Sequence, residues 1–502
     1  ALIGPNNLKT NAMNALPELD YVQPFQTLPQ SLYSQVMPQG LSNPRLVIGS
    51  ESTAHLLGLD INTIEQAGSL KLISGQAVLN IWDPIAMKYT GHQFGQYNPQ
   101  LGDGRGVLLA QVNHQEKTWD MHLKGAGSTP YSRQGDGRAV LRSSIREFLG
   151  SEALAALNIP TTRALCVVDS DTHVYREQQE SGAMLIRVTP SHVRFGHFEF
   201  CSFGNEPALL QTLCDFVIEQ YYPQLIKHEK KYLEFYKITV QKTASLMANW
   251  QGIGFAHGVM NTDNMSILGE TFDFGPFAFL DDYEAGFICN HSDYQGRYAF
   301  NQQPNIAKWN LSVLAQALLP LIDKDPLVEQ LEGFDDVFSE QYFSIMNGKF
   351  GLLGAFDAHQ SFINESLIML ETCKLDFSVF FRKLSDIHNP QVFNYLRNQC
   401  LDIKAFDHWY GQYQQALIED GQTVHETIQA SRKKRMNQVN PKYILRNYLA
   451  QNAIAAAHQG DYSLVQTLHK VLLKPFDEQP EFEAYADLPP DWGKKLEISC
   501  SS

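Results

Sequence analysis

The sequence has 502 residues and a formal net charge of −15, with 44% hydrophobic and 19% charged residues. A chain of this length exceeds the usual size of one hydrophobic core, so we expect a soluble globular protein with two lobes. The negative charge disfavours general binding to nucleic-acid phosphates and to anionic membrane surfaces. No apolar run approaches the roughly 18 residues of a membrane span, so we expect no transmembrane helix.

The first residues carry no fold signal. We interpret residues 1–12 as vector-derived sequence ahead of a native Met13, and we expect no signal peptide. Residues 13–79 mix short helical and loop signals that are interrupted by prolines, and the sequence assigns them no function.

Glycines then cluster ahead of a strand. Gly102, Gly104 and Arg105 lie in Gly-Asp-Gly-Arg-Gly, directly before the apolar run 107–112. Glycines let the backbone approach a ligand closely and leave N–H groups for phosphate oxygens, and Arg105 adds a charge-assisted donor. The spacing matches neither the kinase glycine loop nor a Walker loop, so an ordinary hairpin turn is the alternative.

The next segment predicts a strand, a loop and a helix. Residues 118–124 alternate with the period of a strand that ends at Lys124, and 138–157 has apolar residues at helical spacing around Glu147. In kinases a strand-end Lys contacts nucleotide phosphates and pairs with a helix Glu. Between them lies a second glycine-rich loop with Asp136 and Gly137, placed where a helix N-terminus attracts phosphate. A plain Asp136 N-cap is the alternative.

Strands are predicted at 163–169, 173–177 and 183–189. Arg187 stands inside the last apolar run, where a buried cation needs an anionic partner, and Arg194 follows. A phosphate shared with Lys124 would satisfy these cations, and a local salt bridge of Arg187 is the alternative.

The most informative stretch is 257–275. Asn264 offers an amide oxygen, and Asp273 opens an Asp-Phe-Gly triplet. The residues between them predict a hairpin turning at 269–270, which would bring both side chains to one Mg²⁺ in the manner of protein kinases. A turn at 263–264 with a chance Asp-Phe-Gly triplet is the alternative.

The usual kinase base is missing. It stands five residues before the metal-binding Asn, and here that position is Val259. The nearest carboxylate is Asp263. Either the chain is an inactive kinase fold, or Asp263 serves as the base in different chemistry.

The remainder of the chain predicts helices. They are expected at 206–222, 229–250, 307–322, 325–348, 355–372, 376–387, 390–400, 403–431 and 441–457. Among the seven cysteines no pair has Cys-x-x-Cys spacing, so we expect no zinc cluster.

These motifs resemble the selenoprotein O family of kinase-fold proteins, also regarded as pseudokinases, from about residue 80 to the end. The matching blocks are Gly-His-Gln-Phe-Gly at 91–95, Leu-Gly-Asp-Gly-Arg at 101–105, Leu-Lys-Gly-Ala-Gly at 123–127 and His-Gly-Val-Met-Asn-Thr-Asp-Asn at 257–264. The terminal Cys-Ser-Ser matches as well, with Cys500 where other members carry selenocysteine.

The resemblance implies transfer of AMP from ATP to Ser, Thr or Tyr hydroxyls of proteins. It assigns proton acceptance to Asp263, Mg²⁺ (or Mn²⁺) to Asn264 and Asp273, and orientation of Lys124 to Glu147. It assigns nucleotide contacts to Gly102, Gly104, Arg105, Lys124, Asp136, Gly137, Arg187, Arg194 and Asp273. It also suggests redox control, for which Cys289 and Cys500 are the hypothesised disulfide pair.

The expected fold is α+β and kinase-like. We expect an N-terminal extension at 13–79, a β-rich N-lobe at 80–204, a helical C-lobe at 205–430 and a C-terminal extension at 431–502. We further expect a cytoplasmic bacterial monomer whose partners are protein substrates, without nucleic acid or membrane. An ordinary kinase, an inactive nucleotide-binding scaffold and a redox protein built on Cys500 are the rival interpretations.

Overall fold

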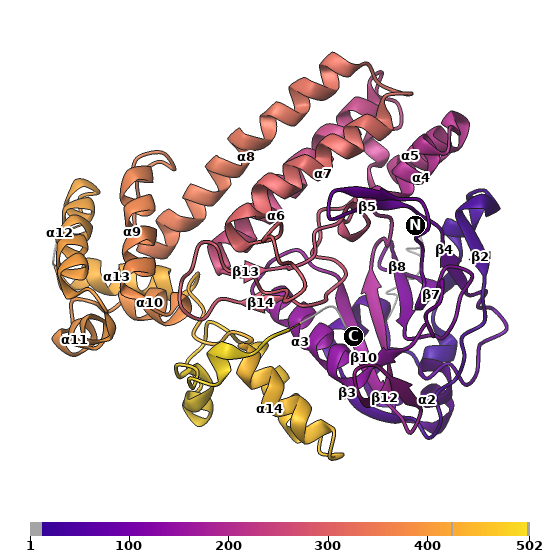
Figure 1. Ribbon diagram of the computed structural model, residues 1–502, viewed down its shortest axis with the longest axis horizontal. Coiled ribbons are helices and arrows are strands. Elements are labelled where there is room, and N and C mark those ends of the chain that lie inside the picture. Colours follow the sequence, from indigo (N-terminus) through magenta and orange to yellow (C-terminus); the bar gives the residue numbers. More distant parts are fainter. Residues whose placement is uncertain (1–12, 423–424, 499–502) are drawn as a thin grey trace, which may run out of the picture. The chain divides into compact units, whose positions relative to one another are not determined.

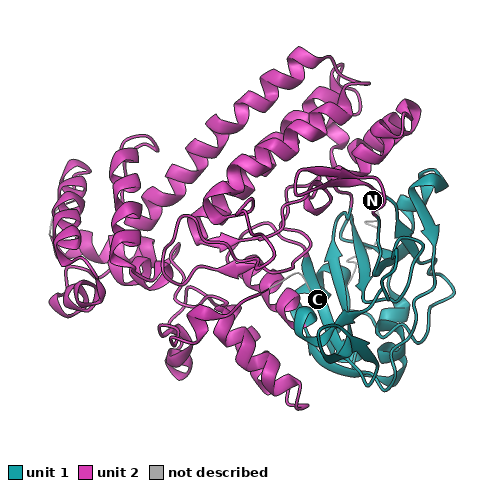
Figure 2. Cartoon of the chain, viewed as in Figure 1, with its two compact units in different colours: residues 1–88, 102–144, 163–192 teal, residues 89–101, 145–162, 193–502 magenta. Residues whose placement is uncertain are grey.

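The computed structural model describes residues 13–422 and 425–498 (Figure 1). The chain divides into two compact units, neither of which is a continuous segment (Figure 2). Unit 1 contains Ala1–Lys88, Gly102–Ser144 and Arg163–His192, and unit 2 contains Tyr89–Leu101, Ile145–Thr162 and Val193–Ser502. Strands are concentrated in the N-terminal part and helices in the C-terminal part, so the fold is mixed α/β as the sequence predicts.

Unit 1 is built on one antiparallel sheet. Its strand order is β2 (Tyr33–Gln35), β4 (Ile85–Met87), β7 (Gly106–His114), β8 (Lys117–Lys124), β12 (Gln179–Thr189), β10 (Arg163–Asp169) and β3 (Arg45–Gly49). Three short strands join its sides: β1 (Tyr21–Val22) pairs with β7, and β9 (Ala139–Val140) and β11 (His173–Tyr175) pair with β12. The long β7–β8 hairpin turns on Gln115 and Glu116, whose φ values of 49° and 61° match the twist of a two-residue loop.

One face of this sheet is the apolar core of unit 1. Val107, Leu109, Met121 and Leu123 alternate along β7 and β8 and pack in one cluster with residues of α1 (Glu51–Leu57) and α2 (Ala67–Ile73). Residues 13–79 therefore supply strands and helices of this core. Since successive side chains point to opposite faces, the other face receives Asp120, His122 and Lys124 of β8.

Unit 2 is mainly helical. The helix α3 (Leu141–Ala156) starts in unit 1 and continues into unit 2. The long helix α6 packs against α7 and α8 (Figure 1). The helices that follow α3 are α4 (Phe195–Phe203), α5 (Pro207–Tyr221), α6 (Lys231–Ile253), α7 (Gln303–Leu318), α8 (Lys324–Phe350), α9 (Gln360–Cys373), α10 (Phe377–Leu384), α11 (Pro390–Gln399), α12 (Ile403–Glu419), α13 (Glu426–Asn437), α14 (Asn447–Ala457) and α15 (Ser463–Leu472).

Short strand pairs complete unit 2. One pair is the hairpin of β5 (Gly91–Gln93) and β6 (Gln96–Asn98). The other pair joins β13 (Phe255–Ala256) to β14 (Ala278–Phe279), and these two strands stand on either side of the stretch 257–275 in the sequence. An aromatic cluster fills the core between α8, α9, α10 and α12, with Phe350, Phe381 and Trp409 fully buried.

The segment 403–431 is not the single helix that the sequence predicts. It forms α12 and α13, which are separated at Gly421 by a φ of 69° that a right-handed helix cannot contain. The sequence prediction also missed α4 and α15. The helix predicted from residue 138 begins at Leu141, because residues 139–140 pair with β12 as β9.

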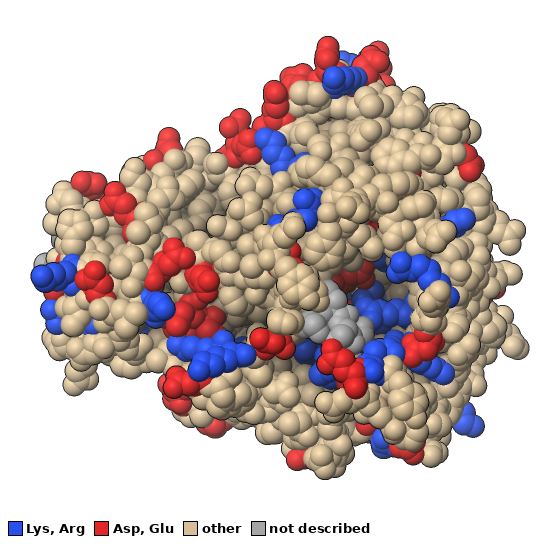
Figure 3. Space-filling view, in the orientation of Figure 1, with Lys and Arg blue, Asp and Glu red and all other residues tan. Residues whose placement is uncertain are grey.

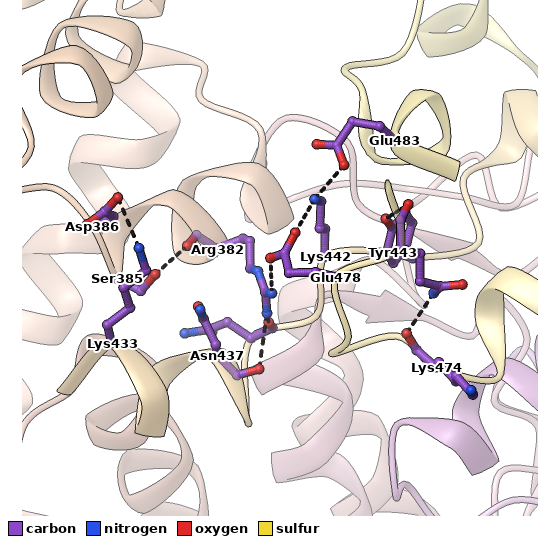
Figure 4. Close-up of polar contacts among 12 residues, drawn as sticks. Arg382, Ser385, Asp386, Lys433, Asn437, Lys442, Tyr443, Lys474, Glu478 and Glu483 are labelled. Atoms are coloured by element: carbon purple, nitrogen blue, oxygen red, sulfur yellow. Dashed lines mark hydrogen bonds and ion pairs between the residues drawn. The ribbon is translucent and has the colours of Figure 1, made fainter. Parts of the chain in front are cut away.

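Ion pairs tie the C-terminal part of unit 2 together. Arg382 and Lys442 both contact Glu478, at 2.7 and 2.5 Å, and Lys442 also contacts Glu483 at 2.7 Å (Figure 4).

Most of the face in Figure 3 is uncharged, with acidic and basic side chains interspersed. Within residues 13–422 and 425–498, no helix is both long and apolar enough to cross a membrane.

Candidate active site

Asp263 is a buried carboxylate in the loop after β13. It lies in the 3₁₀ turn Thr262–Asn264 and is 7% exposed. Its Oδ2 accepts a hydrogen bond from Gln93 Nε2 at 3.3 Å, whereas its buried Oδ1 has no hydrogen-bond partner. Burial raises the pKa of the Asp263 carboxyl to about 7, against the lowering effect of the nearby Arg194. A carboxylate with this pKa is suited to accepting a proton near neutral pH.

Asn264 and Asp273 lie side by side, as the sequence predicts. Asn264 Nδ2 donates to Asp273 Oδ2 at 3.2 Å, and the buried Oδ1 of Asn264 has no partner. The predicted hairpin between them is wrong. Ser266 forms an isolated bridge with Arg194, and Thr271 forms one with Thr161. The turn at 269 is present, but the backbone on each side of it pairs with another segment of the chain instead of with the other side.

Arg194 holds the carboxylate of Asp273. Its Nη1 lies 2.7 Å from Asp273 Oδ2 and donates to the Asp263 carbonyl at 3.1 Å. Its guanidinium also lies 4.3 and 4.5 Å from the ring centroids of Tyr89 and Phe272. Asp273 has a φ of 53°, a strained value for a non-glycine residue that is common at functional sites.

The oxygen atoms of this pair fit a hard divalent cation. An amide oxygen without a partner and a neighbouring carboxylate are typical Mg²⁺ ligands, since Mg²⁺ takes one or two protein oxygens and completes its shell with phosphates and water. Among the described residues, no three His, Cys, Asp or Glu side chains group in a way that could hold a metal ion. The donor set therefore suits a nucleotide-associated cation better than a self-contained metal centre.

His257 joins this loop to the residue before Asp273. Its Nε2 lies 2.6 Å from the Phe272 carbonyl, and its ring stacks on Trp250 with a centroid separation of 5.4 Å. Burial lowers the pKa of His257, so a neutral imidazole donates to that carbonyl. The contact therefore ties the start of the Asp263 loop to the backbone next to Asp273.

The hairpin β5–β6 lies against the same loop, which the sequence prediction missed. Gly91 has no side chain here because a Cβ would stand 2.8 Å from Asp263 Oδ1. The backbone N–H of His92 donates to Thr262 Oγ1 at 2.6 Å. The glycine spacing at 91 and 95 was the only local signal for this segment.

In unit 1, two predicted phosphate-binding cations share one face of the sheet. Lys124 is opposite Leu185, and Arg187 is opposite His122, so the alternation of side chains puts Lys124 and Arg187 on the polar face. Both are buried, at 2% and 7% exposure. Burial of two cations on one face favours an anionic ligand or acidic partners there.

The glycine-rich loops of unit 1 are tightly packed. A Cβ at Gly102 would stand 2.7 Å from the Tyr131 ring, and one at Gly104 would stand 2.9 Å from the Tyr131 carbonyl. Only glycine fits at Gly137, where φ is 68° and a Cβ would overlap the Gly127 carbonyl. Close backbone packing thus accounts for these glycines, whether or not phosphate also binds.

Asp136 is not the helix N-cap. It is separated from α3 by β9, and it forms an ion pair with Arg176, at 2.8 Å. The hydrogen bond from Arg176 lowers the pKa of Asp136. Glu147 is buried within α3, at 1% exposure, and its predicted pairing with Lys124 stays a prediction, as does the nucleotide contact of Arg105.

Cys289 is buried, and its Sγ lies 3.5 Å from the Ala256 carbonyl. Cys500 lies outside the described residues, so the pairing of the two stays a prediction. The last described residue, Ile498, accepts a hydrogen bond at its carbonyl from the His291 N–H at 2.8 Å.

Known proteins resemble this chain over nearly its full length. A sequence model of the family described as "Protein adenylyltransferase SelO" matches residues 15–473. A protein of Stutzerimonas stutzeri named "Protein nucleotidyltransferase YdiU" is 51% identical over 492 residues, covering 98% of this chain and 100% of the relative. Proteins of the same name from Pseudomonas fluorescens SBW25 and Pseudomonas putida GB-1 are also 51% identical, with the same coverage.

These matches define an enzyme of the nucleotidyltransferase class. The chain belongs to the protein adenylyltransferase SelO family. The family resemblance drawn from the sequence is thereby confirmed.

Proposed function

We propose that this protein transfers AMP from ATP to Ser, Thr or Tyr hydroxyls of protein substrates and releases pyrophosphate. The observation that carries the proposal is the position of the Asp263 carboxylate beside the side-chain oxygens of Asn264 and Asp273. A buried carboxylate with one unpartnered oxygen adjoins two oxygen ligands, while Val259 takes the place of the kinase base. The names of the family and of its relatives support nucleotidyl transfer.

Each group then has a role in the reaction. Asp263 accepts the proton of the acceptor hydroxyl as the hydroxyl oxygen attacks the α-phosphorus. The bond from the α-phosphorus to the bridging oxygen breaks, and pyrophosphate leaves with the bonding electrons. Asn264 and Asp273 would hold Mg²⁺, which would supply positive charge against the charge that develops on the phosphates.

The remaining assignments follow the resemblance. Lys124, Arg187 and Arg194 contact the phosphates, as do the glycine-rich loops with Gly102, Gly104, Arg105, Asp136 and Gly137. Glu147 orients Lys124. We also infer a kinase-like bilobal fold, which the sheet-rich N-terminal part and the helical C-terminal part support.

The decisive experiment determines which phosphate of ATP is transferred to the acceptor protein. The purified protein is incubated with Mg²⁺ and a generic protein acceptor, in parallel with α-labelled and γ-labelled ATP and beside Asp273→Ala and Asp263→Ala. We expect α-label transfer by the wild type only, with ATP binding largely retained in Asp263→Ala and lost in Asp273→Ala. Transfer of γ-label alone would make the protein a kinase. Binding without transfer of either label would favour a scaffold, and full activity of Asp273→Ala would overturn the metal assignment.

Redox control is the second part of the proposal. A Cys289–Cys500 disulfide would tie the C-terminal end to the loop after Asp-Phe-Gly, and the hydrogen bond between His291 and Ile498 supports such a reach. Peptide mapping under oxidising, non-reducing conditions tests it, and a map without this linkage contradicts it.

A further inference from the structure

The β5–β6 hairpin is fastened to the Asp263 loop by backbone donors. The His92 N–H donates to Thr262 Oγ1 at 2.6 Å, and the Phe94 N–H donates to Asn261 Oδ1 at 3.0 Å. Phe94 also lies on the Tyr298 ring, with centroids 5.1 Å apart. These contacts hold the hairpin in place without any help from the side chain of residue 93.

The side chain of Gln93 contacts Asp263 instead of fastening the hairpin. It leaves the strand between these two backbone donors and reaches Asp263, with Nε2 3.3 Å from Oδ2. Its Oε1 accepts from Asn98 Nδ2 at 3.5 Å, across the hairpin. An ionised carboxylate only accepts, and Asn98 offers an N–H, so both neighbours favour the same orientation of the Gln93 amide.

The consequence concerns the two oxygens of Asp263. Oδ2 is engaged by Gln93, whereas Oδ1 is buried and has no hydrogen-bond partner. Gly91 packs against Oδ1, since a Cβ there would stand 2.8 Å from it. Gln93 therefore engages one oxygen of the carboxylate, and the other is enclosed without a hydrogen bond.

We propose that Gln93 is a positioning residue, which holds Asp263 by Oδ2 and fixes the rotation of the carboxylate for proton acceptance. This inference rests on the proposed function, since Asp263 is the proton acceptor of that reaction. Holding a catalytic group at one rotation contributes to the rate because the reacting atoms must meet in a narrow range of geometries. The effect should therefore fall on the transfer step and leave nucleotide binding unchanged.

The test is Gln93→Met, which keeps the length of the side chain and removes the donor. We expect kcat for α-label transfer to fall on the order of 10-fold, within the range for partners that orient an active-site group. The KM for ATP and the thermal midpoint should stay near the wild-type values, because the hairpin remains fastened by its backbone. Gln93→Asn, whose amide is one methylene too short to reach Asp263, should show the same loss and covers the case in which Met alters the hairpin.

Gln96 provides the matched control. It stands opposite Gln93 in the hairpin register and is exposed, so Gln96→Met should transfer label at the wild-type rate.

The outcomes separate the two proposals. Wild-type kcat in both Gln93 variants overturns the positioning role and leaves the proposed function intact. Absence of α-label transfer by the wild type overturns the proposed function, and this inference with it.

Discussion

Gly91→Ala is the substitution whose effect on Asp263 can be worked out most directly. A Cβ at this position would lie 2.8 Å from Asp263 Oδ1, 3.0 Å from Asp263 Cβ and 3.1 Å from Thr262 Oγ1. The residue lies in strand β5 and does not have the left-handed conformation that disfavours alanine. The whole effect therefore comes from contact with the Asp263 loop.

The distances set the size of the effect. Ordinary contact begins at 3.4 Å, so the closest pair must separate by about 0.6 Å (3.4 − 2.8). A misplacement of about 1 Å in a catalytic group costs on the order of 10²-fold in rate, so about half of that distance should cost roughly 10-fold in kcat. The overpacking itself should cost about 1–3 kcal/mol of stability.

The assay compares initial rates of α-label transfer, ATP affinity by calorimetry and the thermal midpoint. Gly333→Ala in α8 is the control, because a Cβ there meets nothing within 4 Å. We expect Gly91→Ala to lower kcat with little change in ATP affinity, and Gly333→Ala to lower neither. A Gly91→Ala enzyme with wild-type kcat would refute the reasoning, because Asp263 would then tolerate displacement.

Three further perturbations follow from the geometry. Arg446→Met should cost about 3–5 kcal/mol of unfolding free energy, measured by denaturant titration, because the buried Arg446 pairs with the buried Asp376 at 2.7 Å and with the partly buried Asp281 at 2.8 Å, and both carboxylates lose their cation. A loss below about 1 kcal/mol would contradict this. Burial raises the pKa of Asp120 to about 7, so the folded state keeps a proton that the unfolded state loses near pH 4, and wild-type stability should fall as pH rises from about 4 to about 7. Asp120→Asn should flatten this slope in urea midpoints taken at pH 5 and pH 8, and an unchanged slope would exclude Asp120 as its source. Asn264→Ala should raise the Mg²⁺ concentration for half-maximal transfer at least about 10-fold in a metal titration, whereas an unchanged value would remove Asn264 from the metal site.

The sequence was most informative where a signal is local. The strand that ends at Lys124, the helix around Glu147 and the Asn264–Asp273 pair could be predicted because strand alternation, helical spacing and a short connection all act over a few residues. The hairpin predicted inside 264–273 was wrong even though its ends meet. The backbone of Ser266 and Thr271 pairs with residues 194 and 161, and no local pattern encodes partners so distant.

The coverage of Asp263 could not be predicted for the same reason. Gly91 and Gln93 are separated from Asp263 by about 170 residues, and their local pattern resembles any glycine-rich turn. Likewise, the ion pair between Arg194 and Asp273 joins two residues for which the sequence analysis predicted nucleotide contacts, and for Asp273 also the metal, but no contact with each other. Only the packed structure shows that one side chain fixes the other.

The division of the chain also has a consequence for its synthesis. Unit 1 has all of its residues once residue 192 has been made, whereas unit 2 needs residues 89–101 and 145–162 from the first third of the chain. The His92 N–H and its acceptor Thr262 are separated by 170 residues. At typical elongation rates, the ribosome needs roughly 10–30 s to make the chain between them. The residues that cover Asp263 therefore leave the ribosome well before the loop that they contact has been made.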